Sequence, residues 1–300
     1  LQPGAAYCGL VAAADIGIPV QSQAFENSPM LWAGVMPRPG QDGYKHQRGH
    51  LKAVSGPASA TGAARLSATA GLRAGAGLVT VMSPPGAMTV NASHLTAVML
   101  QVFDGASDLE AAAKQAQVMV IGPAAGITPA TRANVEALLK SQSRVLLDAD
   151  ALTVFDSAPA SLFKRLRPHD IMTPHMGEFK RLFGDLAETG VNKIEVARKA
   201  ARDAGCVVLL KGADTVIAAP DGRAIVNTHA TPWLATAGAG DVLAGLIAGF
   251  MAQGMPTLEA AAMGAWVHGE AGRRVGAGLI SEDLERHVPD ILSALHGEIA

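Results

Sequence analysis

The sequence is poor in cysteine and in net charge. Its two cysteines among 300 residues, Cys8 and Cys206, lie far apart and outside any CxxC pattern. A disulfide framework and a structural zinc site are therefore not expected, and the composition is typical of a reducing compartment. The formal net charge is −2. No long run of one sign occurs, so neither nucleic acid nor an anionic membrane is indicated as a partner.

Long hydrophobic runs are also missing. The most apolar uninterrupted stretch, residues 242–252, is much shorter than the roughly 20 residues that a membrane-spanning helix needs. The N-terminus has no positively charged region ahead of an apolar stretch, so it predicts no secretory signal. We therefore expect a soluble cytoplasmic protein.

Small and aliphatic side chains are abundant instead. Aromatic residues make up 4% of the chain, but hydrophobic residues reach 49%, which favours helices packed on a sheet over a β-sandwich. Apolar runs alternate with Ala-rich helical stretches from Leu51 onward, which indicates βαβ units and a mainly parallel sheet. The predicted strands are 51–54, 78–82, 118–121, 145–147, 207–210 and 215–219. The predicted helices are 62–74, 129–140, 177–183, 191–204, 241–253 and 257–275.

The sharpest motif is "ATAGAGDVLAGLIAGF", residues 235–250. Its glycines at 238 and 240 let backbone N–H groups converge, and Asp241 then stands at the N-terminus of a helix. An anion-binding nest beside a carboxylate suits phosphoryl transfer, with Asp241 taking the proton from a hydroxyl. A Gly-rich turn with Asp241 as N-cap explains the same residues, so this motif alone leaves both interpretations open.

The segment "TPHMGEFKRLFG", residues 173–184, places His175 and Glu178 on one face at a helix start. His175 suits a polar ligand, and Glu178 suits a hydrated Mg²⁺ held through water. The alternative is a capping arrangement of Thr173 with a Glu in the first turn, and this segment taken alone favours it.

Three further features follow predicted strands. Lys211 and Gly212 in "LLKGADTVIAAPDGR" suit a phosphate, or belong to a surface hairpin that turns at residues 221–222. Asp148 and Asp150 in "VLLDADAL" suit a metal or sugar, or a helix cap. The turns "VIGPAAG" and "SGPASATGAA" need Gly with or without a ligand.

Other catalytic signatures are missing. The sequence has no G-x-S-x-G elbow, no P-loop lysine motif and no intact G-x-G-x-x-G fingerprint. Five histidines show no metal-ligand spacing and are interpreted as core or surface residues: His46, His50, His94, His229 and His268.

In chain order, these motifs resemble the carbohydrate-kinase-like domain of the NAD(P)H-hydrate dehydratase family. The resemblance runs from about Lys45 to Leu295 and does not depend on one short match. The matching segments are "TGAARLSATAGLRAGAGLVTV", "VIGPAAG", "LLDADAL", "TPHMGEF", "LLKGADTVIA", "ATAGAGDVLAGLIAGF" and "AWVHGEAG". Two departures lie in turns: Ser55-Gly56-Pro57 replaces Gly-Gly-Ser, and Ala124-Ala125 replaces Gly-Leu.

The resemblance implies an α/β fold, a ribokinase-like three-layer sandwich with a mainly parallel central sheet flanked by helices, over residues 45–300. It implies that the S-epimer of hydrated NADH or NADPH is phosphorylated on its ring hydroxyl by ADP or ATP, with Mg²⁺. Phosphate then leaves and the double bond returns. Hydroxide is a poor leaving group, and phosphorylation removes that barrier.

The resemblance also assigns residues. Asp241 matches the catalytic aspartate, which also contacts the hydrate. Glu178 lies where related kinases keep the acid that organises Mg²⁺, and His175 replaces the Asn of that motif. Hydrate-binding positions match Ala63, Gly126 and His175. Nucleotide-binding positions match Lys211, Gly212, Ala213, Asp214, Thr215, Gly238, Ala239 and Gly240.

Bifunctional members of the family carry an epimerase domain before this one. Residues 10–20 read as an apolar strand, and residues 1–20 resemble the end of such an epimerase domain. Residues 21–44 mix Ser, Asn, Pro and Gly and predict a linker. We therefore expect a fragment of a two-domain parent that lacks epimerase activity itself. The resemblance further implies a homo-oligomer, and the domain order favours ADP as donor.

Two other functions fit parts of the sequence. A kinase of the same fold for a vitamin alcohol would use the same Asp241 chemistry, but it would leave a stable phosphorylated product. A non-catalytic nucleotide-binding domain would be expected to lack the acid at position 241, which is present.

Overall fold

The computed structural model describes residues 17, 22–40, 42–184, 186 and 192–298. These residues contain one ten-stranded sheet in the order β1-β10-β9-β8-β7-β6-β5-β2-β3-β4. Every neighbouring pair is parallel except β8–β9 and β9–β10. The strands are β1 (Ala24–Glu26), β2 (His50–Val54), β3 (Leu78–Ser83), β4 (Met99–Val102), β5 (Val118–Ile121), β6 (Arg144–Leu147), β7 (Ile171–Met172), β8 (Val207–Leu210), β9 (Thr215–Ala218) and β10 (Ala224–Asn227).

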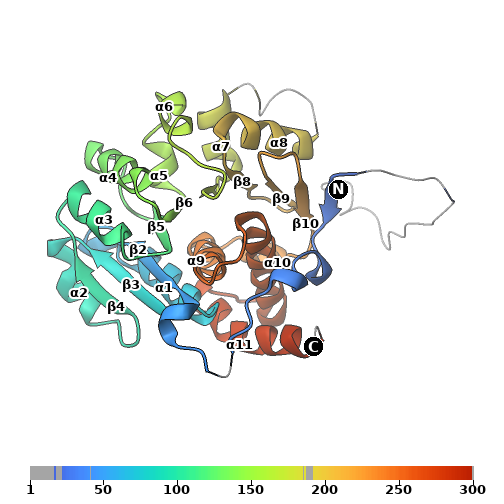
Figure 1. Cartoon of the computed structure of the whole chain (residues 1–300), viewed down its shortest axis with the longest axis horizontal. Helices are drawn as coiled ribbons and strands as arrows, with labels where there is room; N and C mark the ends of the chain where they lie inside the picture. Colours follow the sequence, from blue (N-terminus) through green and yellow to red (C-terminus); the bar gives the residue numbers. More distant parts are fainter. Residues whose placement is uncertain (1–16, 18–21, 41, 185, 187–191, 299–300) are drawn as a thin grey trace.

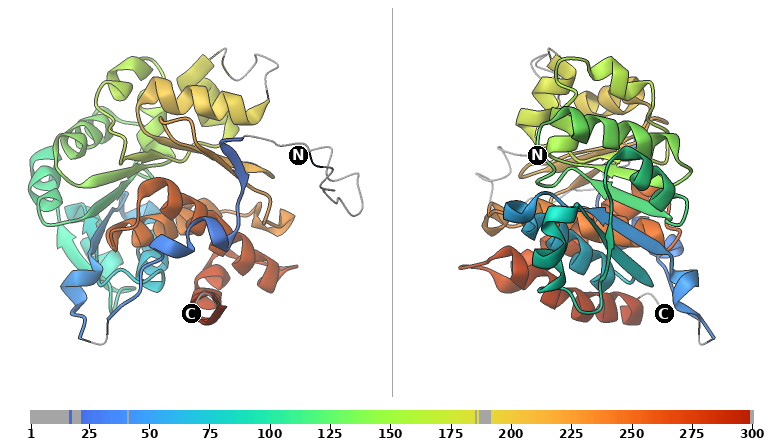
Figure 2. Two further views of the ribbon diagram at one scale, coloured as in Figure 1. Left: turned by 45° about the vertical axis from the view of Figure 1, so that its right-hand side comes forward. Right: turned by 90° about the vertical axis from the view of Figure 1, so that its left-hand side faces the viewer.

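Helices cover both faces of the sheet (Figures 1 and 2). One face packs on α1 (Gly62–Arg73), α9 (Ala239–Ala252), α10 (Thr257–Val275) and α11 (Ser281–Glu298). The other face packs on α3 (Ala106–Ala113), α4 (Pro129–Lys140), α5 (Asp150–Thr153), α6 (Pro159–Phe163), α7 (Met176–Phe183) and α8 (Lys193–Ala204). Short α2 (Met88–Ala92) lies beside β3 and β4.

The two cores follow from the alternation of side chains along the strands. In β6, Leu146 belongs to the core with α9, whereas Val145 and Leu147 belong to the core on the opposite face. A sheet buried on both faces explains why its strands read as continuous apolar runs. The predicted three-layer α/β architecture is thereby confirmed.

All the strands and helices predicted from Leu51 onward are present, with small shifts at their ends. The sequence analysis did not identify β1, β4, β7, β10, α2, α3, α5, α6 or α11. Strand β7 is only two residues long, and β4 is an exposed edge strand, so neither carries an apolar pattern long enough to recognise.

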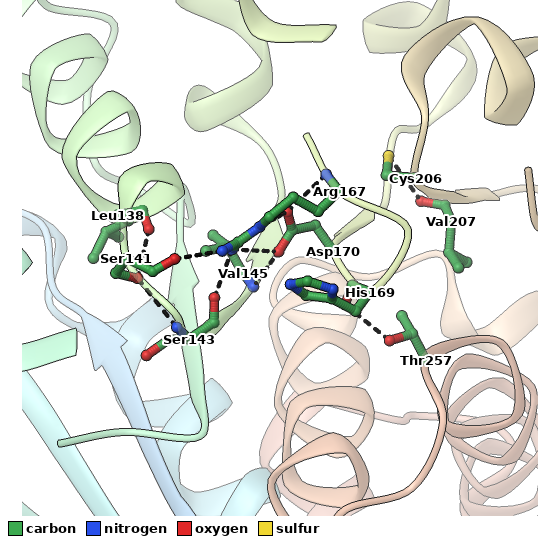
Figure 3. Close-up of polar contacts among 10 residues, drawn as sticks. All are labelled: Leu138, Ser141, Ser143, Val145, Arg167, His169, Asp170, Cys206, Val207 and Thr257. Atoms are coloured by element: carbon green, nitrogen blue, oxygen red, sulfur yellow. Dashed lines mark hydrogen bonds and ion pairs between the residues drawn. The ribbon is translucent and has the colours of Figure 1, made fainter. Parts of the chain in front are cut away.

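A buried ion pair positions β7 despite its length (Figure 3). Asp170 is fully buried and accepts hydrogen bonds from Val145 N at 2.9 Å and from Arg167 Nε at 2.9 Å. The Arg167 guanidinium also donates to the backbone carbonyls of Ser141 and Ser143. The chain before β7 is therefore tied to the chain around the start of β6, as a buried charge requires.

Helix α9 contacts α1 through glycines. A Cβ on Gly245 would lie 2.2 Å from Ser67 O, and a Cβ on Gly249 would lie 2.6 Å from Gly71 O. Neither site has room for a side chain, so the two helix backbones approach closely. This contact fixes the position of the N-terminus of α9.

Part of the segment predicted as a linker joins the fold. Strand β1 pairs with β10, and Trp32 is fully buried, with its ring edge against Trp266 at 6.1 Å between centroids. Asn27 Nδ2 donates to Asn227 Oδ1 and to Ala262 O, both at 2.7 Å. Isolated apolar residues between turn residues carry no periodicity, so only tertiary contacts reveal this packing.

The remaining parts of the predicted N-terminal division are not tested. The predicted strand at residues 10–20, and nearly all of the proposed epimerase tail at 1–20, lie outside the described residues. Among the described helices, none combines the length and apolar character needed to cross a membrane.

Candidate active site

The predicted motifs meet at the carboxyl ends of adjacent parallel strands. Backbone hydrogen bonds join the residues that follow these strands: Asp148 N to Ile121 O at 3.2 Å, Thr173 N to Leu147 O at 3.0 Å, and Lys211 N to Pro174 O at 2.9 Å. Loops at this edge of an open α/β sheet are the usual place for ligands. The sheet order therefore brings together motifs that lie far apart in the sequence.

Gly238 and Asp241 occupy defined positions at the N-terminus of α9. Gly238 is the N-cap with φ +85°, and a Cβ there would lie 2.8 Å from Leu66 Cδ1. Asp241 is the third helical residue, and its backbone carbonyl accepts a hydrogen bond from Ser67 Oγ at 2.8 Å. The interpretation of Asp241 as N-cap is therefore wrong, because the turn ends three residues earlier.

A buried ion pair lies beside this helix end. Lys211 Nζ donates to Asp148 Oδ1 at 2.7 Å, and Asp148 is only 2% exposed. A Cβ on Gly240 would lie 3.7 Å from Lys211 Nζ and 3.9 Å from Asp148 Oδ2. A cation and an anion therefore sit directly against the first turn of α9. The predicted hairpin is present as the antiparallel pair β9–β10, which turns between Ala219 and Arg223, but its strands are largely buried in the sheet. Lys211 precedes this hairpin and pairs with Asp148.

The Asp241 carboxyl is a weaker acid than a free aspartic acid. Its pKa is raised to about 6, first by burial and then by the negative charge of Asp148, while Lys211 opposes the shift. In the described part of the chain, the carboxylate accepts no hydrogen bond from another side chain. A carboxylate with a pKa near the working pH is suited to act as a general base.

A cavity of about 540 Å³ adjoins these residues. Six of the eight residues predicted to bind nucleotide line it: Lys211, Gly212, Ala213, Thr215, Ala239 and Gly240. Asp214 does not, because its carboxylate pairs with Lys193 Nζ at 3.0 Å, and Gly238 lies outside the lining. The lining also includes Asn227, Thr228, Ala230, Thr231, Pro232, Leu234, Ala235, Leu243, Ala265 and His268.

His268 is the lining residue with the most distinctive chemistry. The residue is 8% exposed, and its Nε2 has no hydrogen-bond partner among the described residues. The pKa of His268 is lowered to about 4, mainly by burial and also by the charge of Lys211, while a hydrogen bond to the Ala239 backbone opposes the shift. The ring is therefore neutral at pH 7. A single His in a helix has no spacing signal, which is why the sequence did not assign it to a site.

The three residues predicted to bind the hydrate lie outside that cavity lining. Ala63 is the second residue of α1, and Gly126 follows β5 with φ +83°. The loop before α1 touches the loop of Gly126, because a Cβ on Gly56 would lie 2.0 Å from Ala124 O. His175 follows Pro174, which contacts Lys211 through the backbone. These positions therefore border the same strand ends.

His175 and Glu178 form a capping box at the start of α7. His175 Nδ1 accepts hydrogen bonds from Gly177 N at 2.9 Å and Glu178 N at 3.2 Å, and Glu178 Oε2 accepts one from His175 N at 2.8 Å. The capping alternative is thus confirmed, with His175 rather than Thr173 as the capping residue. No group of three or more His, Cys, Asp or Glu among the described residues is arranged to hold a metal ion.

Comparisons with known proteins agree with this arrangement. The family model described as NAD(P)H-hydrate dehydratase matches residues 51–291. The chain is 37% identical to the ADP-dependent (S)-NAD(P)H-hydrate dehydratase of Xanthomonas campestris, over 88% of this chain and 94% of that protein. It is 38% identical to the bifunctional NAD(P)H-hydrate repair enzyme of Moorella thermoacetica over its whole length, but it spans only 61% of that enzyme.

Solved structures show the same fold. A ribokinase-like superfamily protein from Enterococcus faecalis superposes with a TM-score of 0.81 at 25% identity, over 93% of this chain and 98% of that one. The ADP/ATP-dependent NAD(P)H-hydrate dehydratase of Bacillus subtilis, co-crystallised with ATP and Mg²⁺, gives 0.78 at 25% identity, over 90% and 98%. The chain has a ribokinase-like fold and belongs to the NAD(P)H-hydrate dehydratase family.

Proposed function

We propose that the protein returns the S-epimer of hydrated NADH or NADPH to the reduced cofactor, using an adenine nucleotide as phosphoryl donor. The observation that supports this most is the position of Asp241. Its carboxyl, with a pKa of about 6, stands at the N-terminus of α9 beside the Lys211–Asp148 pair and the 540 Å³ cavity. A base, a cation and a set of helix N–H groups thus converge where a hydroxyl would meet a phosphoryl group.

The reaction then follows in two steps. Asp241 takes the proton of the ring hydroxyl, whose oxygen attacks the terminal phosphorus of the nucleotide. The bond from that phosphorus to its bridging oxygen breaks, and AMP leaves when the donor is ADP, or ADP when it is ATP. The first N–H groups of α9 and Lys211 stabilise the charge on the moving phosphoryl group. The C–O bond then breaks, inorganic phosphate leaves, and loss of a proton from the neighbouring ring carbon restores the double bond.

We assign the nucleotide to the cavity and its loops. Lys211, Gly212, Ala213 and Thr215 line the cavity together with Ala239 and Gly240, which suits a phosphate chain leading to an adenine. Asp214 contributes through Lys193 rather than by direct contact, and Gly238 contributes by capping α9. Ala63, Gly126 and His175 are proposed to receive the hydrated ring on the other side of Asp241.

Mg²⁺ bound to the nucleotide would neutralise phosphate charge, and it usually keeps several waters and few protein ligands. That chemistry fits a site without a cluster of acids. Glu178 is 6% exposed and one of its oxygens already accepts from His175 N, so only a contact through water suits it.

We also propose the identity of the phosphoryl donor and the domain organisation of the protein. The Xanthomonas relative is named ADP-dependent and the B. subtilis enzyme ADP/ATP-dependent, so we expect ADP to serve. The Moorella relative is bifunctional, in line with residues 1–20 being the end of an epimerase domain and 45–300 being the dehydratase domain. We further propose that the protein is cytoplasmic and forms a homo-oligomer. The kinase alternative has less support, because both named relatives are hydrate repair enzymes.

The test is absorbance in the reduced-nicotinamide band. The protein is incubated with hydrated NADH, Mg²⁺ and ADP, ATP or no nucleotide. Recovery of absorbance and release of phosphate that both depend on a nucleotide are expected. If folded protein gives no recovery with either donor but forms a stable phosphorylated product from a hydroxymethyl compound, the vitamin-alcohol kinase is correct instead.

A further inference from the structure

The turn Asp148-Ala149-Asp150, after β6, has a strained backbone. Ala149 adopts φ 48° and ψ −120°, and Ala124 in the neighbouring loop adopts φ 54°. These are the two non-glycine residues with positive φ in the described part of the chain. Such conformations cost free energy and persist where the surrounding structure holds them, often at functional sites. Both strained residues lie at the carboxyl edge of the sheet.

The turn sends its two carboxylates to different partners. Asp148 Oδ1 accepts from Lys211 Nζ at 2.7 Å, on the side of the cavity. Asp150 Oδ2 accepts from Gly126 N at 2.8 Å, on the side proposed for the hydrated ring. The two carboxylates lie only two residues apart in sequence. Asp148 contacts Lys211 on the cavity side, and Asp150 contacts Gly126 on the side proposed for the ring.

The loop that carries Gly126 is packed tightly at its start and loosely at its end. A Cβ on Gly122 would lie 1.7 Å from Asp148 O, and Ala125 N donates to Gly122 O at 3.0 Å. At Gly126, the nearest heavy atom to an added Cβ is Thr128 Cγ2 at 3.7 Å. Hydrogen bonds rather than packing hold the peptide between Ala125 and Gly126: its N–H donates to Asp150, and its carbonyl accepts from Thr131 Oγ1 at 3.0 Å.

We propose that Asp150 is a positioning residue that fixes the Gly126 backbone for the hydrated nicotinamide ring, while Asp148 in the same strained turn holds Lys211 for the nucleotide. The assignment of the ring to Gly126 rests on the proposed function. The hydrogen bond from Gly126 N to Asp150 does not.

The kinetic test compares three variants. Asp150→Ala removes the acceptor and is expected to raise KM for the hydrate about tenfold, because the Gly126 backbone loses its hydrogen bond to a charged group. KM for the nucleotide should stay within about twofold. Asp150→Asn keeps an oxygen that accepts from Gly126 N, so it should restore most of the hydrate affinity. The matched control is Asp156→Ala, an exposed carboxylate in the same segment.

Several outcomes would overturn the proposal. An unchanged hydrate KM in folded Asp150→Ala would show that the contact does not position the ring. Equal rises in both KM values would indicate a general structural role. Loss of activity in Asp150→Asn as complete as in Asp150→Ala would show that the charge, and not the acceptor, is required.

Amide hydrogen exchange tests the contact without any turnover. The Gly126 amide should exchange faster in Asp150→Ala than in the wild type or in Asp150→Asn, at equal global stability. Equal exchange in all three would refute the positioning role even if the protein proves not to be a dehydratase. An inactive wild type with protected Gly126 would instead refute only the proposed function.

Discussion

At the scale of single residues, the site contains two groups whose pKa differs from that of the free amino acid. Burial and Asp148 raise the pKa of Asp241, and burial lowers the pKa of His268. Both residues lie at or near the N-terminus of α9. The ionisation of each is therefore measurable as a function of pH.

Asp241→Asn is expected to lower turnover on the order of 10²–10⁴-fold, because the general base is lost, while nucleotide binding persists. In the wild type, kcat/KM should fall as pH falls through about 6, where Asp241 becomes protonated. The variant should also melt at a higher temperature at neutral pH, because ionising a half-buried carboxyl with a raised pKa opposes folding. Near-normal turnover in the variant would contradict the assignment.

His268 makes the protein sensitive to acid. Between about pH 4 and 6.5 the unfolded chain binds a proton that the folded ring does not, so stability falls as pH falls through this window. The loss is on the order of 3 kcal/mol when complete. Asp241 contributes the opposite slope in nearly the same window, so the test is the difference between the two proteins: the melting temperature of His268→Gln should rise relative to that of the wild type as pH falls from 7 to 4. A difference that does not change with pH would indicate that folding leaves the pKa of His268 unshifted.

At the scale of elements, the contact between α1 and α9 positions Asp241 in the site. Ser67 in α1 holds the Asp241 carbonyl, and glycines let the two helices meet. Lys193 holds the 211–215 loop in place, because its Nζ donates a hydrogen bond to Asp214 O at 2.6 Å. The active-site geometry is therefore a result of helix packing.

Gly245→Ala tests that packing. Helix propensity alone predicts a gain of up to about 1 kcal/mol, but the new Cβ would lie 2.2 Å from Ser67 O. Overpacking in a core costs about 1–3 kcal/mol, so we expect net destabilisation and lower turnover. Gly62→Ala is the matched control, since nothing lies within 4 Å of its added Cβ. A stabilised Gly245→Ala in thermal denaturation would refute the close contact.

At the scale of the whole molecule, residues 24–36 connect the start of the described chain to the nucleotide side. Asn27 donates to Asn227, which lines the cavity, and to Ala262 in α10, and it accepts from Trp32 Nε1 at 3.2 Å. The segment therefore closes the β10 edge of the sheet and braces one wall of the site.

Asn27→Ala should lower the free energy of unfolding by about 3 kcal/mol, because several buried polar groups lose their partner. KM for the nucleotide should rise as Asn227 loses its support. Ser22→Ala, which removes only exposed hydrogen bonds to Ala24, serves as the control. Denaturation curves that coincide for wild type and Asn27→Ala would mean that residues 24–36 act only as a linker.

The sequence by itself determined most of the long helices and the strands buried on both faces, such as β5 (Val118–Ile121), because such strands read as apolar runs and their helices as amphipathic stretches. It also placed Asp148 and Lys211 at strand ends, since each follows an apolar run, and His175 and Asp241 at helix starts. Both are local properties of the chain.

Tertiary structure alone decided which of those residues meet. The order β8-β7-β6-β5 brings Lys211 to Asp148, which lies 63 residues earlier, and the packing of α10 brings His268 to the cavity. It also packed Trp32 into the core. Contacts between distant segments depend on sheet order and helix packing, and a single sequence carries no local signal of either.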